Sequence, residues 1–287
     1  MTPPSQITYI GHATILTEIA GYRLLTDPLL RSRVAHLRRQ VPLLAGDWTK
    51  NLDAILISHL HLDHFDLPSL RRLARQTRLL VPQGAAQLLR RQGFTAVEAL
   101  APGDTADIGT LPVTATAALH SGFRPPLGPT ITALGYLIGA RRRIYFPGDT
   151  DLFPQMAEYS DDLDTALLPV WGWGPTLGPG HLNPERAAEA LQLLRPRLAV
   201  PIHWGTLAPL GVRTHRAGFL TDPPHQFAAH AARLAPDVRV EIIQPGQSLW
   251  LPTVGSLEIS PQRHRGTEGR REGREKDGIE RRGAEEE

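Results

Sequence analysis

Four metal-binding side chains lie within six consecutive residues, and this stretch constrains the chain more than any other part of the sequence. Residues 59–64 read His59-Leu60-His61-Leu62-Asp63-His64, directly after the apolar run 54–57. Alternate side chains of an extended segment lie on the same side, so His59 and His61 can reach one cation together. Asp63 and His64, on the turn that follows, point elsewhere. The stretch therefore indicates a metal-dependent hydrolase in which one loop supplies ligands to two neighbouring metals.

The chemistry of these side chains favours zinc. A set of imidazoles and carboxylates suits zinc or another borderline divalent ion better than calcium or magnesium. The sequence contains no cysteine, which excludes disulfides and thiolate ligands, so every further ligand must be His, Asp or Glu. We expect two divalent metal ions, with zinc as the first choice and manganese, iron or nickel as alternatives.

Length and charge bound the class of protein. With 287 residues and 41% apolar content, the chain can bury a sizeable core as one large domain or as two halves that share an interface. Its net charge of +2 does not argue for nucleic acid as a partner. No stretch approaches the roughly 18 apolar residues of a membrane-spanning helix, and the start lacks a secretory pattern. These features predict a soluble cytoplasmic protein, and they leave a homo-oligomer open.

The composition changes sharply near residue 255. Residues 256–287 contain 8 Lys and Arg, 9 Asp and Glu, repeated Gly and almost no apolar side chain after Ile259. Such a segment cannot bury enough apolar surface to offset the entropy of ordering. We predict one folded domain over residues 1–255 and a charged, disordered tail over residues 256–287.

Strand and helix patterns alternate in two rounds within the predicted domain. Period-two patterns and turn signals predict strands at 7–10, 13–19, 22–26, 113–119, 133–138, 143–146, 165–168, 198–202, 238–243 and 248–251. Capping residues and apolar spacing predict helices at 67–76, 83–92, 187–194 after an Asn183 cap, and 225–234. Strands buried under helices on both sides predict a layered α/β architecture.

Three more ligand candidates lie where predicted strands end. They are His120, Asp149 and His203. The end of a strand is a place where a rigid sheet can present several side chains to one cleft. We therefore expect these three residues to complete the metal site.

The order of these residues resembles the metallo-β-lactamase superfamily of binuclear metallohydrolases. The resemblance covers nearly all of residues 6–251 and rests on the stretch 59–64, the isolated His120, the segment Phe146-Pro147-Gly148-Asp149-Thr150 and the late His203. It implies a four-layer αββα sandwich in which two similar halves meet and the metal site lies at one edge of the sheets. Carried over by position, it implies that one metal is held by His59, His61 and His120, the other by Asp63, His64 and His203, and that Asp149 bridges the two.

Shorter motifs narrow the resemblance to one branch of the superfamily. They are Tyr9-Ile10-Gly11-His12-Ala13-Thr14, Thr26-Asp27-Pro28, His181-Leu182-Asn183-Pro184-Glu185 and Pro201-Ile202-His203-Trp204-Gly205-Thr206. They look like the branch that contains N-acyl-phosphatidylethanolamine phospholipase D-like and ascorbate-6-phosphate lactonase-like enzymes. The motifs are specific for the branch and weak for the substrate. His61 stands where redox di-iron members tend to use glutamate, which favours hydrolysis over electron transfer.

The predicted chemistry is hydrolysis by a metal-bridging hydroxide. Two cations that share a solvent molecule lower its pKa towards neutrality, while one of them polarises the oxygen under attack. Asp63 and Asp149 are predicted to orient this hydroxide, and Asp27 or Thr150 to accept the second N–H of a ligating imidazole. The expected substrate is a small ester, lactone or phosphodiester. The alternatives are a phospholipase D-like phosphodiesterase that acts on a lipid and a nuclease of the same superfamily, although the charge balance disfavours nucleic acid.

His181 is a further candidate for the active site. It precedes the helix that Asn183 is predicted to cap, where a helix N-terminus favours anions. Two roles stay open: contact with the leaving group or an anionic intermediate, and simple fastening of the Gly-rich loop 172–180. His12 is predicted to have a structural role or to support a metal ligand. Three tryptophans near these residues form either an apolar wall of the site or part of the core: Trp171, Trp173 and Trp204.

Residues 28–50 form an insertion rich in arginine. Leu30, Val34, Leu37 and Val41 recur at near-helical spacing. This spacing predicts a solvated surface helix over the core, and a basic amphipathic lid that touches lipid or an anionic substrate is the alternative.

Overall fold

The computed structural model describes residues 5–73, 75–124, 126–212 and 218–251. The chain divides into two units, Met1–Thr253 and Val254–Glu287. All described helices and strands belong to the first unit. The tail predicted at residues 256–287 lies outside the described residues, and its disorder stays a prediction.

Deleting residues 256–287 is expected to leave folding and metal content unchanged, because the segment has almost no apolar side chains to bury. Thermal melting and elemental analysis of the shortened chain check this. A melting temperature lower by more than about 4 °C, roughly 1 kcal/mol for a domain of this size, would show that the segment packs against the domain.

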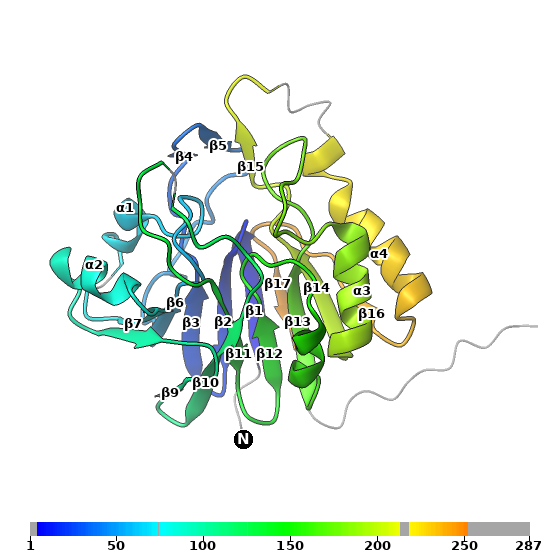
Figure 1. Cartoon of the computed structure of the whole chain (residues 1–287), viewed down its shortest axis with the longest axis horizontal. Helices are drawn as coiled ribbons and strands as arrows, with labels where there is room; N and C mark the ends of the chain where they lie inside the picture. Colours follow the sequence, from blue (N-terminus) through cyan, green and yellow to red (C-terminus); the bar gives the residue numbers. More distant parts are fainter. Residues whose placement is uncertain (1–4, 74, 125, 213–217, 252–287) are drawn as a thin grey trace, which may run out of the picture. The chain divides into compact units, whose positions relative to one another are not determined.

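Two seven-stranded sheets form the centre of the first unit (Figure 1). The strands of the first sheet are, in spatial order, β17 (Ser248–Trp250), β1 (Gln6–Gly11), β2 (Thr14–Ile19), β3 (Tyr22–Thr26), β6 (Ala54–Leu56), β7 (Arg78–Pro82) and β8 (Val97–Leu100). Those of the second sheet are β16 (Arg239–Val240), β14 (Leu198–Ile202), β13 (Leu163–Pro169), β12 (Arg143–Phe146), β11 (Leu134–Ile138), β10 (Leu111–Ala117) and β9 (Thr105–Ile108).

The two sheets repeat one pattern of strand directions. In the first sheet β17, β1, β2 and β3 are successively antiparallel, and β6, β7 and β8 then join in parallel. In the second sheet β9 to β12 are antiparallel, and β13, β14 and β16 join in parallel. The prediction of two similar halves is confirmed.

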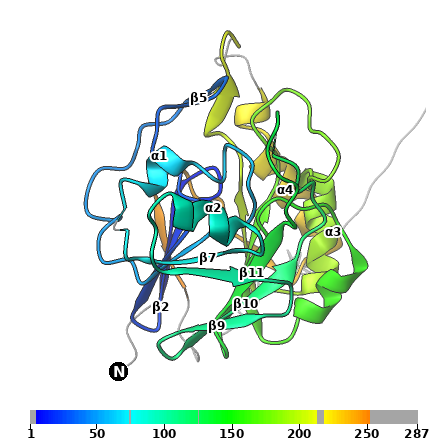
Figure 2. The same ribbon diagram turned by 60° about the vertical axis from the view of Figure 1, so that its left-hand side comes forward.

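Helices cover the outer faces of both sheets. They are α1 (Leu67–Leu70), α2 (Ala85–Arg91), α3 (Pro184–Leu194) and α4 (Pro223–Leu234). The first two lie on the side of the first sheet and the last two on the side of the second (Figure 1), and Figure 2 shows α2 in front of β7. None of the helices in the described ranges is long and apolar enough to cross a membrane.

Alternation along the strands builds the layers. Ala54 and Leu56 of β6 pack in the core between the two sheets, whereas Ile55 and Ile57 pack with the residues of α1 and α2. A strand buried on both faces is apolar throughout, which explains the apolar run 54–57. The predicted four-layer αββα sandwich is confirmed.

The helix boundaries follow their caps. The side chain of Asn183 accepts a hydrogen bond of 2.8 Å from the Arg186 N–H, and Pro184 begins α3 as predicted. Asp66 caps α1 in the same way through Ser69. The predicted helix 67–76 is too long, however, because the chain changes after Leu70 to tighter bonds that span three residues.

The surface helix predicted within residues 28–50 is wrong. This segment forms a hairpin of β4 (Arg33–Val34) and β5 (Leu37–Arg39), which pairs with β15 (Leu207–Pro209) in a small third sheet. Val34 and Leu37 are directly opposite each other across a two-residue turn and are both buried. A spacing of three across such a turn places two side chains on one face, as it does in a helix, so the pattern suits both structures.

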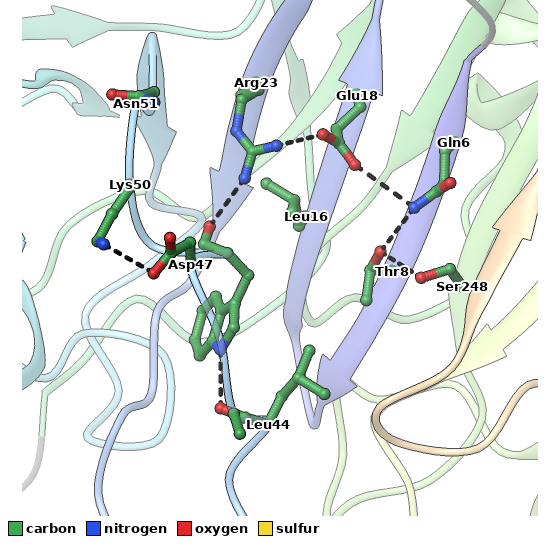
Figure 3. A pocket seen from close by; sticks show the side chains of 12 residues that line it. Gln6, Thr8, Leu16, Glu18, Arg23, Leu44, Asp47, Lys50, Asn51 and Ser248 are labelled. Carbon is green, nitrogen blue, oxygen red and sulfur yellow. Dashed lines mark hydrogen bonds and ion pairs between the residues drawn. The ribbon is translucent and has the colours of Figure 1, made fainter.

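The outer face of β1, β2 and β3 carries a polar groove (Figure 3). Its volume is about 440 Å³. Glu18 pairs with Arg23, and Lys50 lies 2.8 Å from Asp47. The charges of the groove are thus compensated within it.

Candidate metal centre

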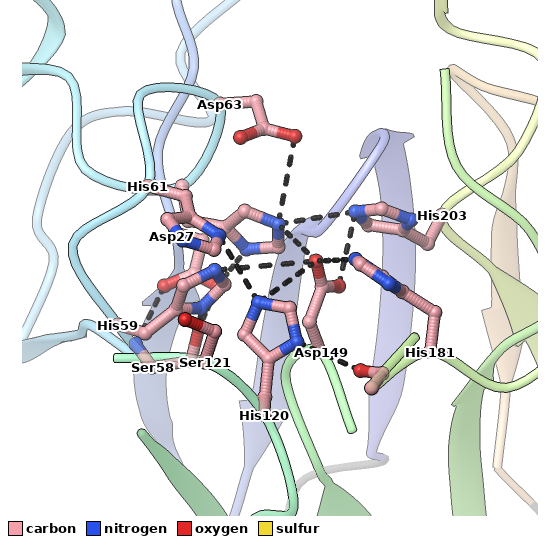
Figure 4. Close-up of polar contacts among 12 residues, drawn as sticks. Asp27, Ser58, His59, His61, Asp63, His120, Ser121, Asp149, His181 and His203 are labelled. Carbon is pink, nitrogen blue, oxygen red and sulfur yellow. Dashed lines mark hydrogen bonds and ion pairs between the residues drawn. The ribbon is translucent and has the colours of Figure 1, made fainter. Parts of the chain in front are cut away.

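The predicted ligands follow strands that end at one edge of their sheets. In the first sheet β1, β3 and β6 run in the same direction, and in the second β10, β12 and β14 do. The loops at these ends carry His12 after β1, Asp27 after β3, residues 59–64 after β6, His120 after β10, Asp149 after β12 and His203 after β14. Figure 4 shows the labelled side chains converging from both sheets.

One group consists of His59, His61 and His120. One nitrogen of each ring lies within 4.8 Å of the others, and His61 Nδ1 is 3.0 Å from His120 Nε2. Tetrahedral zinc with nitrogen ligands at its usual bond length separates those nitrogens by about 3.3 Å. His59 Nε2 is buried and has no hydrogen-bond partner among the described residues. The group therefore fits one metal ion.

A second group consists of His12, Asp63, His64 and His203, whose ligand atoms also lie within 4.8 Å of one another. His64 Nε2 is 3.0 Å from His203 Nε2. His12 Nε2 lies 2.9 Å from Asp63 Oδ2. The structure thus brings Asp63, His64 and His203 together as predicted and adds His12 as a neighbour of the carboxylate.

Asp149 lies between the two groups. Its Oδ2 is 3.2 Å from His64 Nε2 and 4.0 Å from His59 Nε2, and its Oδ1 is 3.1 Å from His203 Nε2. Oδ1 is buried without a hydrogen-bond partner among the described residues. All seven predicted ligands therefore converge, while their roles as ligands stay predictions.

Gly148 permits this approach of the two halves. It has a φ of 63°, and a Cβ atom at this position would lie 2.5 Å from Ser58 Cβ. Any side chain would separate the loop of Asp149 from the loop of His59, so glycine is required here.

Each ring of the five converging histidines has an outward partner on its other nitrogen. These pairs are His59 Nδ1 with Ser58 Oγ at 2.9 Å, His61 Nε2 with Phe123 O at 2.9 Å, His64 Nδ1 with Asp27 Oδ2 at 2.8 Å, His120 Nδ1 with Gly180 O at 2.7 Å and His203 Nδ1 with Trp171 O at 2.8 Å. An acceptor on one ring nitrogen fixes the tautomer that leaves the other with a free lone pair. The lone pairs therefore point into the centre, as metal binding requires.

Asp27 supports two of these rings. Its buried carboxylate accepts from His64 Nδ1 and, at 2.6 Å, from Ser58 Oγ, which in turn contacts His59. Thr150, the predicted alternative, accepts from the Leu119 N–H and donates to the Asp151 carbonyl instead. Sequence reasoning did not single out Ser58, because a lone serine before a histidine forms no pattern.

The electrostatics of the centre favour a cation. Burial lowers the pKa of His203 to about 3 and holds the pKa of His59 well below its usual value. Burial acts in the same direction on His64, but Asp149 and Asp63 raise its pKa well above the usual value. Burial disfavours the Asp149 carboxylate as well, yet His203 and His64 hold the pKa of Asp149 well below its usual range. Neutral rings at His59 and His203 beside the charged carboxylate of Asp149 are the donors that a metal cation needs.

His181 lies at the partly exposed side of Asp149. Its Nε2 is 3.4 Å from Asp149 Oδ2, and its Nδ1 is 3.1 Å from the carbonyls of Gly178 and Pro179. Burial opposes its charge, but Asp149 raises the pKa of His181 to about 9. His181 thus both fastens the loop and points its Nε2 towards the centre.

The three tryptophans differ in their surroundings. Trp204 is buried in the core, and Trp173 packs with the β4–β5 hairpin, where its ring centroid is 5.0 Å from that of His36. The carbonyl of Trp171 accepts from His203. The core alternative thus holds for Trp204.

Comparison with known proteins identifies the family. The beta-lactamase superfamily domain matches residues 22–204, which contain the whole candidate centre except His12. The chain belongs to this superfamily. It is 32% identical over 260 residues to a UPF0173 metal-dependent hydrolase of Rubrobacter xylanophilus. The aligned residues cover 85% of this chain and 96% of that protein. The predicted family is confirmed, and the Rubrobacter relative is named a metal-dependent hydrolase.

A second relative matches over less of its length. The chain is 30% identical over 230 residues to N-acyl-phosphatidylethanolamine-hydrolyzing phospholipase D 1 of Caenorhabditis elegans. The aligned residues cover 71% of this chain and 64% of that protein. The chain therefore spans less than two thirds of the nematode enzyme.

Solved structures agree with the fold. Igni18, a metallo hydrolase from Ignicoccus hospitalis, has a TM-score of 0.68 and 24% identity, covering 88% of this chain and all of that one. An isothiocyanate hydrolase from Delia radicum gut bacteria has a TM-score of 0.67 and 20% identity, covering 85% and 98%. At these identities the likeness supports the sandwich fold alone.

Proposed function

We propose that this metal-dependent hydrolase uses two zinc ions and a hydroxide nucleophile to cleave a small ester, lactone or phosphodiester. The observation that carries the proposal is that two clusters of histidines meet at Asp149. In each of the five rings, the nitrogen that faces away from the centre makes a hydrogen bond. His59 Nε2 and Asp149 Oδ1 are buried without a hydrogen-bond partner among the described residues, and a bound metal ion would satisfy both atoms.

The residues divide the work as follows. His59, His61 and His120 would hold one ion, Asp63, His64 and His203 the other, and Asp149 would contact both. Two such ions, when bound, supply a hydroxide near neutral pH and polarise the oxygen under attack.

His181 is suited to the leaving group. Its Nε2 lies 3.4 Å from Asp149 Oδ2 at the partly exposed side of the centre, where a substrate has access. We propose that it donates a proton to the departing oxygen, as a general acid does.

A lipid phosphodiester is the second candidate, and exposed apolar side chains favour it. Leu62 is 37% exposed, Leu119 53% and Phe123 42%. Leu62 and Leu119 adjoin His61 and His120, and the Phe123 carbonyl accepts from His61. Exposed apolar side chains beside a site suit the acyl chains of a lipid. The nematode relative is named for hydrolysis of such a phospholipid.

Two measurements test the function. Elemental analysis is expected to find close to two metal ions per chain, and removing them with a chelator is expected to abolish turnover, which added zinc restores. The metal-loaded protein is then assayed against paired esters, lactones and phosphodiesters, each with a short and a long acyl chain. A chain that holds two metals but cleaves none of these bonds would contradict the proposal, and a strict need for long chains would favour the lipid candidate.

The cytoplasmic location belongs to the same proposal, and fractionation of the producing cells tests it. The oligomeric state stays open, and light scattering after size-exclusion chromatography measures it.

A further inference from the structure

A buried arginine contacts two of the segments that carry the candidate metal centre. Arg39, on β5 of the inserted hairpin, is 7% exposed, and burial lowers its pKa to about 10. No carboxylate pairs with it in the part of the chain that the structure describes. A buried charge is costly without an opposite charge, and an apolar side chain of similar volume is often neutral or stabilising in its place. A buried guanidinium that no described carboxylate pairs with therefore calls for a specific task.

The hydrogen bonds of Arg39 indicate that task. Its Nη2 donates to the Leu29 carbonyl at 2.8 Å and its Nη1 to the Ile10 carbonyl at 3.4 Å. Leu29 lies two residues after Asp27, and Ile10 lies two residues before His12. One guanidinium thus joins the ends of β1 and β3, which carry the side chains that hold Asp63 and His64.

These strand ends have strained backbones. His12 has a φ of 58°, Asp27 of 35° and His203 of 64°. Residues other than glycine keep such angles only where the surrounding structure holds them. Gly11 provides the room, since a Cβ atom there would lie 2.9 Å from Arg39 Nη1.

The same hairpin also reaches the segment of His203. Arg39 pairs with Leu207 of β15, and the Gln40 N–H donates to the Thr206 carbonyl at 2.8 Å. Thr206 Oγ1 accepts from the His12 N–H at 2.7 Å, and the His203 N–H donates to the His12 carbonyl at 3.0 Å. All three predicted ligands of the second metal therefore depend on segments that the hairpin holds together.

We propose that Arg39 is a positioning residue for the metal held by Asp63, His64 and His203, and that the insertion serves to place it there. Of the ligands of the other metal, only His59 is linked among the described residues to a segment that Arg39 contacts, through Ser58 and Asp27. The outward partners of His61 and His120 are the carbonyls of Phe123 and Gly180, which Arg39 does not contact. The other metal position is therefore affected less. The inference rests on the proposed binuclear function.

Zinc titration against a chromophoric chelator tests the role of Arg39. The proteins compared are the unaltered full chain, Arg39→Met, Arg39→Lys and the control Arg38→Met. Arg38 is an exposed neighbour of Arg39 on the same strand. Arg39→Met is expected to lower the affinity for one of the two zinc ions by about 10–100-fold, the usual effect of losing an outer partner of a metal site. The affinity for the other zinc ion is expected to stay within about threefold of its value in the unaltered chain. The metal-free melting temperature is expected to stay unchanged or rise, because a buried charge is removed. Arg39→Lys is expected to be intermediate and Arg38→Met to match the unaltered chain.

Two results would overturn the inference. The first is that Arg39→Met binds both zinc ions with the affinities of the unaltered chain. The second is that both zinc affinities fall equally and the metal-free melting temperature falls as well, because Arg39 would then only stabilise the fold. If Arg39→Met does not fold, Arg39→Lys decides, because it keeps the charge and loses the forked contact to two carbonyls. An unaltered chain that binds fewer than two zinc ions would instead contradict the proposed function, and this is measured before any variant.

Discussion

Replacing Asp149 with alanine is expected to remove metal and hydrolytic activity together. Its carboxylate approaches both groups of imidazoles, at 3.1 Å from His203 and 3.2 Å from His64 in one group and at 4.0 Å from His59 and from His120 in the other. Loss of an outer partner of a metal site costs about 10–100-fold in affinity, so loss of a residue that is proposed to contact both ions should exceed this range. Elemental analysis and turnover with the best substrate of the panel check the result.

Asp151→Ala is the matched control for this variant. Asp151 follows the same strand, but its carboxylate bonds to Arg186 at 2.6 Å and to the Leu152 N–H, away from the rings. It is expected to keep its metal. Full metal occupancy in Asp149→Ala would remove Asp149 from the bridging position.

Asp27→Asn is expected to have the second largest effect. The buried carboxylate accepts from His64 Nδ1, from Ser58 Oγ and, at 2.8 Å, from the Ser58 N–H. An amide of the same shape turns an N–H towards one of these donors. We expect metal affinity to fall about 10–100-fold and the free energy of unfolding to fall by about 3–5 kcal/mol, as when one partner of a buried pair is lost. Zinc titration and denaturant unfolding measure the two effects.

The control for this variant is Asp53→Asn. Asp53 is exposed, and its carboxylate accepts only from the Arg23 N–H at the other end of β3 among the described bonds. A change at such a surface position is usually within about 0.5 kcal/mol. If Asp27→Asn keeps both its stability and its metals, the support that Asp27 gives to His64 and Ser58 is not needed.

Much of the fold could be predicted from local patterns. The meander β1–β3, the buried strands β12, β13 and β14, and the helix that begins after Asn183 lie where periodicity and capping place them. Such signals are carried by neighbouring residues, so they are present in the sequence itself. The strands β7 and β8 were not predicted, because short apolar strands between helices have no distinct period.

The inserted hairpin shows the limit of periodicity. Val34 and Leu37 are three residues apart, and this spacing buries one face of a helix or two opposite positions of a hairpin. Only the pairing of β5 with β15, more than 160 positions later in the chain, decides between them. Long-range pairing is invisible to any local pattern, and so the role of Arg39 could not be inferred from the sequence.

The candidate ligands are all visible in the order of residues: a run at 59–64 and three candidates at the ends of strands, which a family resemblance groups into one site. Tertiary structure decided which ring nitrogen faces the centre, because the outward partners are main-chain carbonyls of Phe123, Gly180 and Trp171 and the carboxylate of Asp27. Every residue has a carbonyl, so no residue type marks the one that will accept a histidine N–H; only the packing of two sheets brings it within reach.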